Sequence, residues 1–397
     1  MIIRKRVLIT AVALATAAAV TACASSSGSG GNTSGSSGGT YNWGVDAELS
    51  GALSYYGLSI ASGVEAYVHE VNASGGINGH KIKLTQLDNA GDASQSATVA
   101  TQLITADSVD AIFGQTLSTD CSAAQPIDNH YQVPIACFSV AAQNPYVFGL
   151  GFDDSRVSGA MLQSALKVTS TSRPTAALLY PNTPTVIDMA KDILASAPAM
   201  GVKVTSSQEY DLTATDLSVQ IANVVAAKPD VVLISATGPA LVTVLKGFRA
   251  AGLKAPVVFS DGTGNIGFLA TTDDSSLYAL NDYEYIQASG ATGGAADFLA
   301  AMGSKLGKNP TAATINTGQA IDSYITASAF GQALKACGYP CSGAQLTKKI
   351  DAVHLSLPDL EPSFGYTASD HYPYPNWYLY RVTGPTATLI DTFPVTK

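Results

Sequence analysis

The chain has 397 residues, of which 46% are hydrophobic and 13% are charged, and its formal net charge is −9. A chain of this length and apolar content is expected to form about two globular domains rather than a disordered polymer. Its acidic balance, which becomes more negative without Arg4, Lys5 and Arg6, would repel phosphate backbones and argues against nucleic-acid binding.

Residues 1–22 have the pattern of an export signal, with basic residues, a short apolar run and small residues before Cys23. The ending Val20-Thr21-Ala22-Cys23 resembles the lipobox of bacterial lipoproteins, in which the cysteine carries the acyl chains. The alternative is an ordinary signal peptide that is cut among these small residues. Residues 23–40 are almost entirely small and polar, so we expect a flexible tether.

The next segments alternate between strand-like and helix-like patterns about every 25 residues, which predicts a parallel sheet covered by helices. In chain order they are strand Tyr41–Leu49, a helix from Leu58 to Val71, strand Lys81–Leu87, a helix ending at Ile104, strand Val109–Phe113, a helix from Ser118, and strand Val133–Phe138.

The same alternation restarts after Asp154 and predicts a second lobe of similar α/β architecture. It gives strands Ala176–Tyr180, Val202–Gln208, Val231–Ile234 and Pro256–Ser260, with helices after Pro184, at Asp216–Ala227 and at Pro239–Gly252. Two more helices, Ala295–Leu306 and Ile315–Ala336, precede short strands at Phe364–Tyr366, Trp377–Val382 and Thr386–Phe393.

The stretch Val109–Thr119 is a strand, a short polar loop and the start of a helix. Ligands of open parallel sheets sit at the carboxyl ends of such strands, and a helix N-terminus with a hydroxyl can hold a carboxylate. An ordinary βα turn with a serine cap is the alternative. Asp120 is expected to cap this helix and point outward. If it points inward, the ligand is neutral or cationic.

Several segments, in order and spacing, resemble the type I periplasmic substrate-binding proteins, with the leucine/isoleucine/valine-binding branch of ABC transporters most similar. They are Leu49-Ser50-Gly51, Tyr56-Gly57, Val71–Gly79, Leu87-Asp88, Val109–Gly114, Asp216–Ile221, Lys228–Val232, Phe248–Leu253, and Phe364-Gly365-Tyr366 with Asp370. The resemblance implies two Rossmann-like lobes with parallel sheets, joined by a three-crossover hinge. The implied domains are lobe 1 at 41–153, lobe 2 at 154–287, a return to lobe 1 at 288–362, and a return to lobe 2 at 363–397.

The resemblance also implies a ligand site between the lobes. Its residues are Tyr56, Gln115, Thr116, Leu117, Ser118, Ser139, Ala141, Gln143, Asn182, Thr183, Thr237 and Asp261. Ser118 matches the hydroxyl that holds a ligand carboxylate, and Asp261 falls near the acidic partner of an amino group. A second-lobe tyrosine of the family has no evident counterpart beside Asn182 or Thr237, so the ligand's identity does not carry over.

Two competing signals are weak. Gly262–Gly267 matches G-x-G-x-x-G formally, but it follows a late strand rather than the first one, which argues against a dinucleotide. The five histidines lack the spacing of zinc ligands, and no nucleophile stands with a base and an orienting group. We therefore expect no metal, no cofactor and no catalysis.

With Cys23 assigned to lipid, four cysteines remain, and export makes disulfides plausible. Three pairings are open, and free buried thiols are the alternative. We favour Cys121 with Cys137, which would join the Ser118 helix to the adjacent strand, and Cys337 with Cys341.

Together these features predict a monomeric lipoprotein on the outer face of the cytoplasmic membrane. It would capture a small polar ligand, most simply an amino acid, by hinge closure and deliver it to an ABC permease. A receptor that signals through a membrane partner would look identical in sequence, and an exported enzyme on a two-lobed scaffold is the third alternative.

Overall fold

The computed structural model describes residues 38–397 except 139–143, 152, 236–237, 261–273, 287–290, 307–317, 385 and 396–397. Residues 38–397 form one compact unit that contains two large sheets and a small one. The predicted Cys23 and its tether, the G-x-G-x-x-G segment, and the site residues Ser139, Ala141, Gln143, Thr237 and Asp261 lie outside the described residues.

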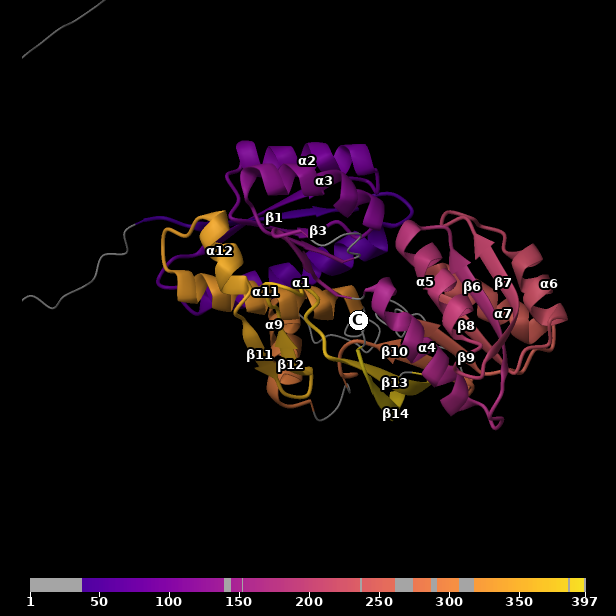
Figure 1. Ribbon diagram of the computed structural model, residues 1–397. Coiled ribbons are helices and arrows are strands. Elements are labelled where there is room, and N and C mark those ends of the chain that lie inside the picture. The colour runs from indigo at the N-terminus through magenta and orange to yellow at the C-terminus, as the bar shows by residue number, and fades with distance from the viewer. Residues whose placement is uncertain are drawn as a thin grey trace, which may run out of the picture. The chain divides into compact units, whose positions relative to one another are not determined.

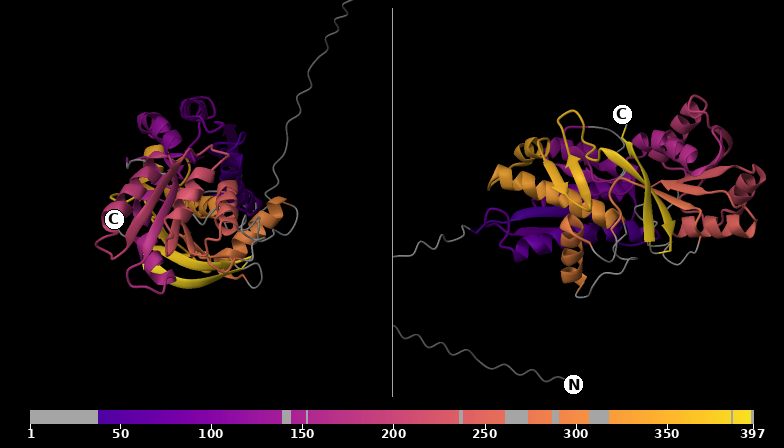
Figure 2. Two further views of the ribbon diagram at one scale, coloured as in Figure 1. Left: turned by 90° about the vertical axis from the view of Figure 1, so that its right-hand side faces the viewer. Right: turned by 90° about the horizontal axis from the view of Figure 1, so that it is seen from below.

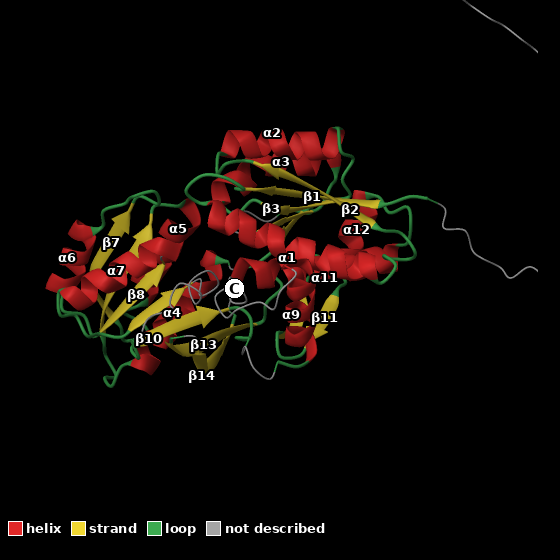
Figure 3. Ribbon diagram, turned by 180° about the vertical axis from the view of Figure 1, so that it is seen from behind, coloured by secondary structure: helices red, strands yellow, loops and turns green. Residues whose placement is uncertain are grey.

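The first lobe is built on a five-stranded parallel sheet in the order β2-β1-β3-β4-β5. Helices α2 and α3 cover one face, and α1 and α11 cover the other (Figures 1 and 3). The early elements are β1 (Tyr41–Ala47), α1 (Ser54–Ala73), β2 (Ile82–Asp88), α2 (Ala93–Thr105), β3 (Ala111–Gly114), α3 (Ser118–Tyr131), β4 (Ile135–Cys137) and β5 (Val147–Gly149).

The second lobe is built on a seven-stranded sheet in the order β14-β13-β10-β9-β8-β6-β7. Its elements are α4 (Asp154–Val168), β6 (Thr175–Pro181), α5 (Pro184–Ser196), β7 (Lys203–Tyr210), α6 (Ser218–Ala226), β8 (Val231–Ser235), α7 (Gly238–Ala250), β9 (Val257–Ser260) and β10 (Leu277–Asn281).

The chain then returns to the first lobe and finally to the second sheet. The return elements are α9 (Gly293–Leu306), α11 (Gly318–Cys337), α12 (Gly343–Ile350), and a two-stranded sheet of β11 (His354–Leu357) and β12 (Glu361–Gly365). Strands β13 (Asn376–Thr383) and β14 (Thr386–Pro394) add an antiparallel hairpin to the second sheet (Figure 2). The chain therefore passes between the two sheets three times, after β5, β10 and β12, as the fold prediction requires.

Strands β3, β4, β5, β8 and β9 are short, apolar and wholly buried, because helices cover both faces of each sheet, whereas the edge strands β2 and β7 are partly exposed. Trp43, Phe113 and Phe148 are buried in the first lobe, and Phe259 and Trp377 are buried in the second. Each predicted element in the described residues has a counterpart, and α1 begins at Ser54 rather than Leu58.

Several elements were missed by sequence reasoning. They are α4, β5, β10, α12 and β11. β5 has only three residues, too few for a period to show. The eight-residue α12 begins with a capping box between Ser342 and Gln345, a signal that could have located it.

Candidate functional site

The loop after β3 has an unusual backbone. Gly114 and Gln115 have positive φ angles of 130° and 49°, and the Gln115 amide donates to the carbonyl of Asp46 at 2.7 Å. A Cβ at position 114 would stand 2.1 Å from that carbonyl oxygen, so only glycine fits there. Positive φ in a non-glycine residue is uncommon and is concentrated at functional sites. The loop is thus held in a shape that its sequence alone would not favour.

The loop delivers Ser118 as the first residue of α3. The preceding residue, Leu117, makes no side-chain cap, as leucine has no acceptor to offer. The Ser118 hydroxyl is buried and has no hydrogen-bond partner among the described residues. A buried hydroxyl without a partner is costly, and a helix N-terminus favours anions. This hydroxyl therefore retains its hydrogen-bonding capacity for another group.

Gln115 and Thr116 point their side chains at two carboxylates at the end of β1, Asp46 in the strand and Glu48 just after it. Gln115 Nε2 donates to Asp46 Oδ2 at 2.9 Å, and Thr116 Oγ1 donates to Glu48 Oε2 at 2.5 Å. These two predicted ligand residues can therefore offer a ligand their main chain, while their side chains fix the loop. Sequence reasoning missed Asp46 and Glu48, although two acids at the end of an apolar strand were a visible signal.

The prediction that Asp120 caps α3 and points outward is wrong. Asp120 is wholly buried, and the N-cap position belongs to Leu117. Its Oδ1 accepts from Thr119 Oγ1 at 3.2 Å, while Oδ2 has no partner among the described residues. Asp120 fails as a cap because it lies inside the first turn of α3, where its carboxylate acts electrostatically on Asp46 and Glu48 at the end of β1. The alternative stated for an inward Asp120, a neutral or cationic ligand, is therefore favoured over an anionic one, and a zwitterion counts among the ligands that are neutral overall.

The region around this loop contains several buried carboxylates, and none of them has a basic side chain as its ion-pair partner in the described residues. Burial raises the pKa of Asp46 and Glu48 to about 7 and that of Asp120 to about 6. Asp128 lies eight residues after Asp120 on α3, and burial raises its pKa well above the usual range. Among the ion pairs of the described residues, none involves any of these carboxylates, so no cation offsets their desolvation.

The other described residues of the predicted site lie on both lobes. Tyr56 is buried on α1, where its ring lies 4.3 Å from that of Tyr55. In the second lobe, Thr183 precedes α5 without capping it, and exposed Asn182 accepts from the amide of Leu212 at 3.1 Å. Their role in binding stays a prediction.

One helix contact and one electrostatic interaction link the edges that carry these residues. Helix α3 of the first lobe touches α5 of the second, so the loops at Ser118 and Thr183 belong to neighbouring helices. Tyr55 on α1 interacts electrostatically with Tyr210, the last residue of β7. Tyr210 is a second-lobe tyrosine that sequence reasoning did not consider, because it ends a strand instead of lying beside Asn182 or Thr237.

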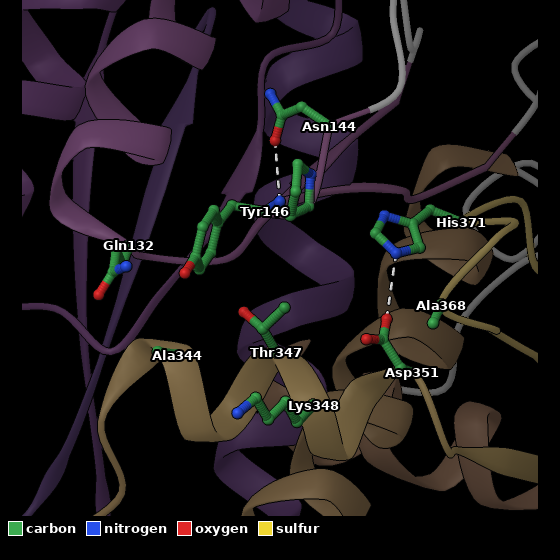
Figure 4. A pocket seen from close by; sticks show the side chains of 10 residues that line it. Gln132, Asn144, Tyr146, Ala344, Thr347, Lys348, Asp351, Ala368 and His371 are labelled. Atoms are coloured by element: carbon green, nitrogen blue, oxygen red, sulfur yellow. Dashed lines mark hydrogen bonds and ion pairs between the residues drawn. The ribbon is translucent and has the colours of Figure 1, made fainter.

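A separate pocket of about 540 Å³ lies beside the amino-terminal ends of β4 and β5, opposite the strand ends that carry the predicted site (Figure 4). Gln132 and Asn144 line it where β4 and β5 begin, and α12 contributes Thr347 and Lys348. In Figure 4 the ring of His371 faces Asp351, with 3.0 Å between Nε2 and Oδ1. Solutes of parallel α/β proteins bind at the carboxyl ends of strands, so this pocket is not the predicted site.

Both favoured cysteine pairs lie at disulfide distance. The Cys121 and Cys137 sulfur atoms are 2.14 Å apart and join α3 to β4, and those of Cys337 and Cys341 are 2.01 Å apart. The first pair fastens the start of α3 beside the loop that carries Ser118.

Nothing in the described ranges gathers three or more potential metal-binding side chains, and no described helix is long and apolar enough to cross a membrane.

The architecture defines the class of protein. Two lobes with mainly parallel sheets and three crossings between them form the type I periplasmic-binding-protein fold.

The family itself follows from sequence comparison. The profile described as "Periplasmic binding protein" matches residues 40–387, and the chain belongs to this family. Leu/Ile/Val-binding protein homolog 8 of Brucella abortus (strain 2308) is 26% identical over 348 residues, covering 80% of this chain and 81% of the relative. Homolog 7 of Brucella suis biovar 1 (strain 1330) is 25% identical over 341 residues, covering 80% of this chain and 82% of the relative.

Solved structures share the fold at lower identity. A solute-binding protein of an ABC transporter from R. palustris, in complex with benzoate, has a TM-score of 0.78 at 18% identity, covering 90% of this chain and 98% of that one. The branched-chain amino acid transporter substrate-binding protein LivJ of Streptococcus pneumoniae, in complex with isoleucine, has a TM-score of 0.74 at 20% identity and covers 90% and 100%.

Proposed function

We propose that this chain is the solute receptor of an ABC importer, and that its two lobes close on a small amino acid or a related carboxylic acid. In this proposal an acylated Cys23 holds the protein on the outer face of the cytoplasmic membrane, and the closed form delivers the solute to the permease. The single observation that carries it is the buried Ser118 hydroxyl, which lacks a partner among the described residues at the N-terminus of α3.

The chemistry of the relatives' solutes fits that observation. Isoleucine and benzoate, bound by the two solved neighbours, each join a carboxylate to an apolar body. A carboxylate would satisfy the Ser118 hydroxyl and gain from the dipole of α3. An isoleucine-sized solute with about nine heavy atoms, each contributing near −1 kcal/mol, would reach micromolar affinity.

The buried Asp120 favours an amino acid over an aromatic acid. Asp120 lies two residues after Ser118 and has one carboxylate oxygen without a partner in the described part of the chain. An ammonium group would compensate this charge and would also pair with Asp261 if that residue occupies its predicted place, whereas benzoate brings only a second negative charge. A zwitterion supplies both signs at once.

Thermal unfolding with a panel of solutes tests the proposal. Amino acids, their amides, and benzoate would each be added to the soluble chain lacking residues 1–23. A solute at about 100 times its Kd should stabilise the protein by about 2.7 kcal/mol. We expect amino acids to raise Tm and benzoate to raise it less. If no amino acid and no carboxylic acid changes Tm, the proposed solute class is wrong.

Anchoring is tested separately in the exporting cell. The full chain should fractionate with membranes, and the mass of its N-terminal peptide should show an acylated Cys23. Cys23→Ser should release the protein from the membrane fraction. Membrane retention of Cys23→Ser would contradict the lipid anchor and would leave the proposed solute class unaffected.

A further inference from the structure

The loop Gln115–Ser118 is held by carboxylates that would be expected to repel one another. Two bonds run from the loop to Asp46, through the Gln115 amide at 2.7 Å and Nε2 at 2.9 Å, and one runs from Thr116 to Glu48 at 2.5 Å. These three bonds cross from β3 to the end of β1. The left-handed backbone at Gln115 is thus maintained by groups outside the loop.

Neighbouring glycines bring the two segments this close. A Cβ on Gly57 of α1 would stand 2.3 Å from the carbonyl oxygen of Glu48, and one on Gly114 would stand 2.1 Å from that of Asp46. In both cases the obstacle is backbone, which cannot move aside cheaply. The chain at Asp46–Glu48 is therefore packed between α1 and the loop, and the Glu48 side chain has little freedom to turn away.

Asp46 and Glu48 differ in how well their charge is solvated. Asp46 accepts hydrogen bonds from Asn89, Ser96 and Gln115 side chains at 2.8–2.9 Å, which favour its ionised form. Glu48 accepts one side-chain hydrogen bond, from Thr116, beside one from its own main-chain amide, and its Oε1 has no partner in the described part of the chain. Both carboxylates are wholly buried. Of the two, Glu48 has fewer side-chain donors to stabilise its ionised form.

The charged groups around Glu48 are also acidic. Asp46 on β1 and Asp120 on α3 act on it electrostatically. Strand β2 ends at Asp88, which accepts from the Leu49 amide at 2.9 Å, and the following loop brings Asp92, the N-cap of α2, which acts on Asp120. From α1 the packed residue is Gly57, which has no charge. Within the described ranges, no lysine, arginine or histidine forms an ion pair with Glu48.

We propose that Glu48, in its protonated form, is the positioning residue that keeps the solute loop Gln115–Ser118 in its left-handed, binding-competent shape. The inference rests on the proposed function only in calling this loop the solute loop. The hydrogen bond between Thr116 and a neutral Glu48 holds the loop at acidic and neutral pH. When the proton leaves, a buried charge with a single side-chain donor remains beside Asp46 and Asp120, and the loop opens to let water reach it. Solute capture should therefore weaken as pH rises above neutrality.

Amide hydrogen exchange of the peptide spanning residues 114–120, without solute, tests this directly. Protection is corrected for the intrinsic pH dependence of exchange. In the wild type it should fall by about tenfold for each pH unit above pH 7, since loop closure is linked to one proton. Glu48→Gln imitates the protonated acid and should keep the protection constant from pH 6 to 8.5. The matched control is Glu361→Gln, which alters another wholly buried carboxylate on β12 and should retain the wild-type profile.

A Glu48→Gln loop that follows the wild-type pH profile would overturn the inference, and so would a flat profile in Glu361→Gln. If Glu48→Gln fails to fold, hydrogen exchange of two Thr116 variants tests the inference instead. Thr116→Val should raise exchange of the loop about tenfold at pH 6, as expected for loss of a hydrogen bond to a buried carboxyl group. Thr116→Ser, which keeps the hydroxyl, should restore wild-type protection. Equal exchange in these two variants would overturn the inference. Because no solute is present, failure to find a solute leaves this result unaffected.

Discussion

Arg156 on the first turn of α4 binds Asp370 through two parallel hydrogen bonds, Nη2 to Oδ1 at 2.7 Å and Nη1 to Oδ2 at 3.1 Å. The guanidinium also bonds Asp153 and lies 4.9 Å over the ring of Tyr372. Arg156 follows the first passage between the sheets, and Asp370 and Tyr372 belong to the third. One cation thus ties together two of the segments that connect the lobes.

Asp370→Asn should lower the free energy of unfolding by about 1.5 to 3 kcal/mol, the range for hydrogen bonds to charged groups. The pair is mostly buried, with side chains 10% and 16% exposed, so the loss should exceed that of a surface ion pair. Urea unfolding gives the difference from the change in midpoint at constant slope.

Asp188→Asn is the matched control, because the Lys191–Asp188 pair has side chains 69% and 67% exposed. It should change stability by less than about 1 kcal/mol. Similar losses in both variants would mean that the Arg156 contact contributes no more than an exposed pair.

Stability should fall as the solution becomes alkaline. Burial raises the pKa of Asp154 and Asp282 to about 7 and that of Glu361 to about 9. A carboxyl whose pKa is raised by folding binds its proton more tightly in the folded state, so its stabilisation is complete below the unfolded pKa and disappears as pH rises through the folded value. Exposed acids with lowered pKa, such as Asp230, act in the opposite direction below about pH 4. Denaturant midpoints should therefore be highest near pH 5 and decline to pH 9.

Glu361→Gln should flatten the alkaline part of that curve. The variant cannot lose a proton at this position, so it should gain at least about 1.4 kcal/mol over the wild type between pH 5 and pH 8, equivalent to one pKa unit. Each protein is compared with itself at pH 5. Parallel curves for the two proteins would show that Glu361 is already ionised at neutral pH.

Most of the architecture could be predicted from sequence because each βα unit carries its own signal. The strand Val231–Ser235 is an uninterrupted apolar run, and α1 shows helical spacing over 20 residues. Elements such as β10 take their structure from neighbours: Leu277–Asn281 pairs with β9 on one side and β13 on the other, and β13 lies about a hundred residues later.

The candidate site could be predicted only in part. The position of Ser118 followed from a local rule about strands and helix N-termini. The orientation of Asp120 did not, because it depends on packing between α3 and the residues that follow β1. Asp46 and Glu48 also escaped detection, since the bonds that give them a role come from Gln115 and Thr116, which lie almost 70 residues later.

The two disulfides should stabilise the protein unequally. Cys121–Cys137 closes a loop with a sequence separation of 16 residues and Cys337–Cys341 one of 4. In the chain-entropy model these are worth about 3 and about 2 kcal/mol. Replacing each pair by alanine and measuring urea unfolding checks the order. The wild type should expose four additional thiols only after denaturing reduction, and fewer than four would mean that one bridge is missing.

Removal of the Ser118 hydroxyl tests the candidate site most directly. Ser118→Ala should weaken binding of an amino acid by about 1.5 to 3 kcal/mol, because it removes a donor to a charged carboxylate. Asp261→Ala should cost a similar amount if it faces the ammonium group. Thr119→Ser, which alters the exposed neighbour of Ser118 but keeps the hydroxyl that donates to Asp120, should leave the Kd unchanged within about twofold. Titration calorimetry with the solute that most raises Tm gives all three values. An amino acid amide should distinguish the two losses of binding free energy. It lacks the carboxylate, so its affinity should fall in Asp261→Ala and not in Ser118→Ala. If Ser118→Ala binds as tightly as Thr119→Ser and the wild type, the solute lies elsewhere than the N-terminus of α3.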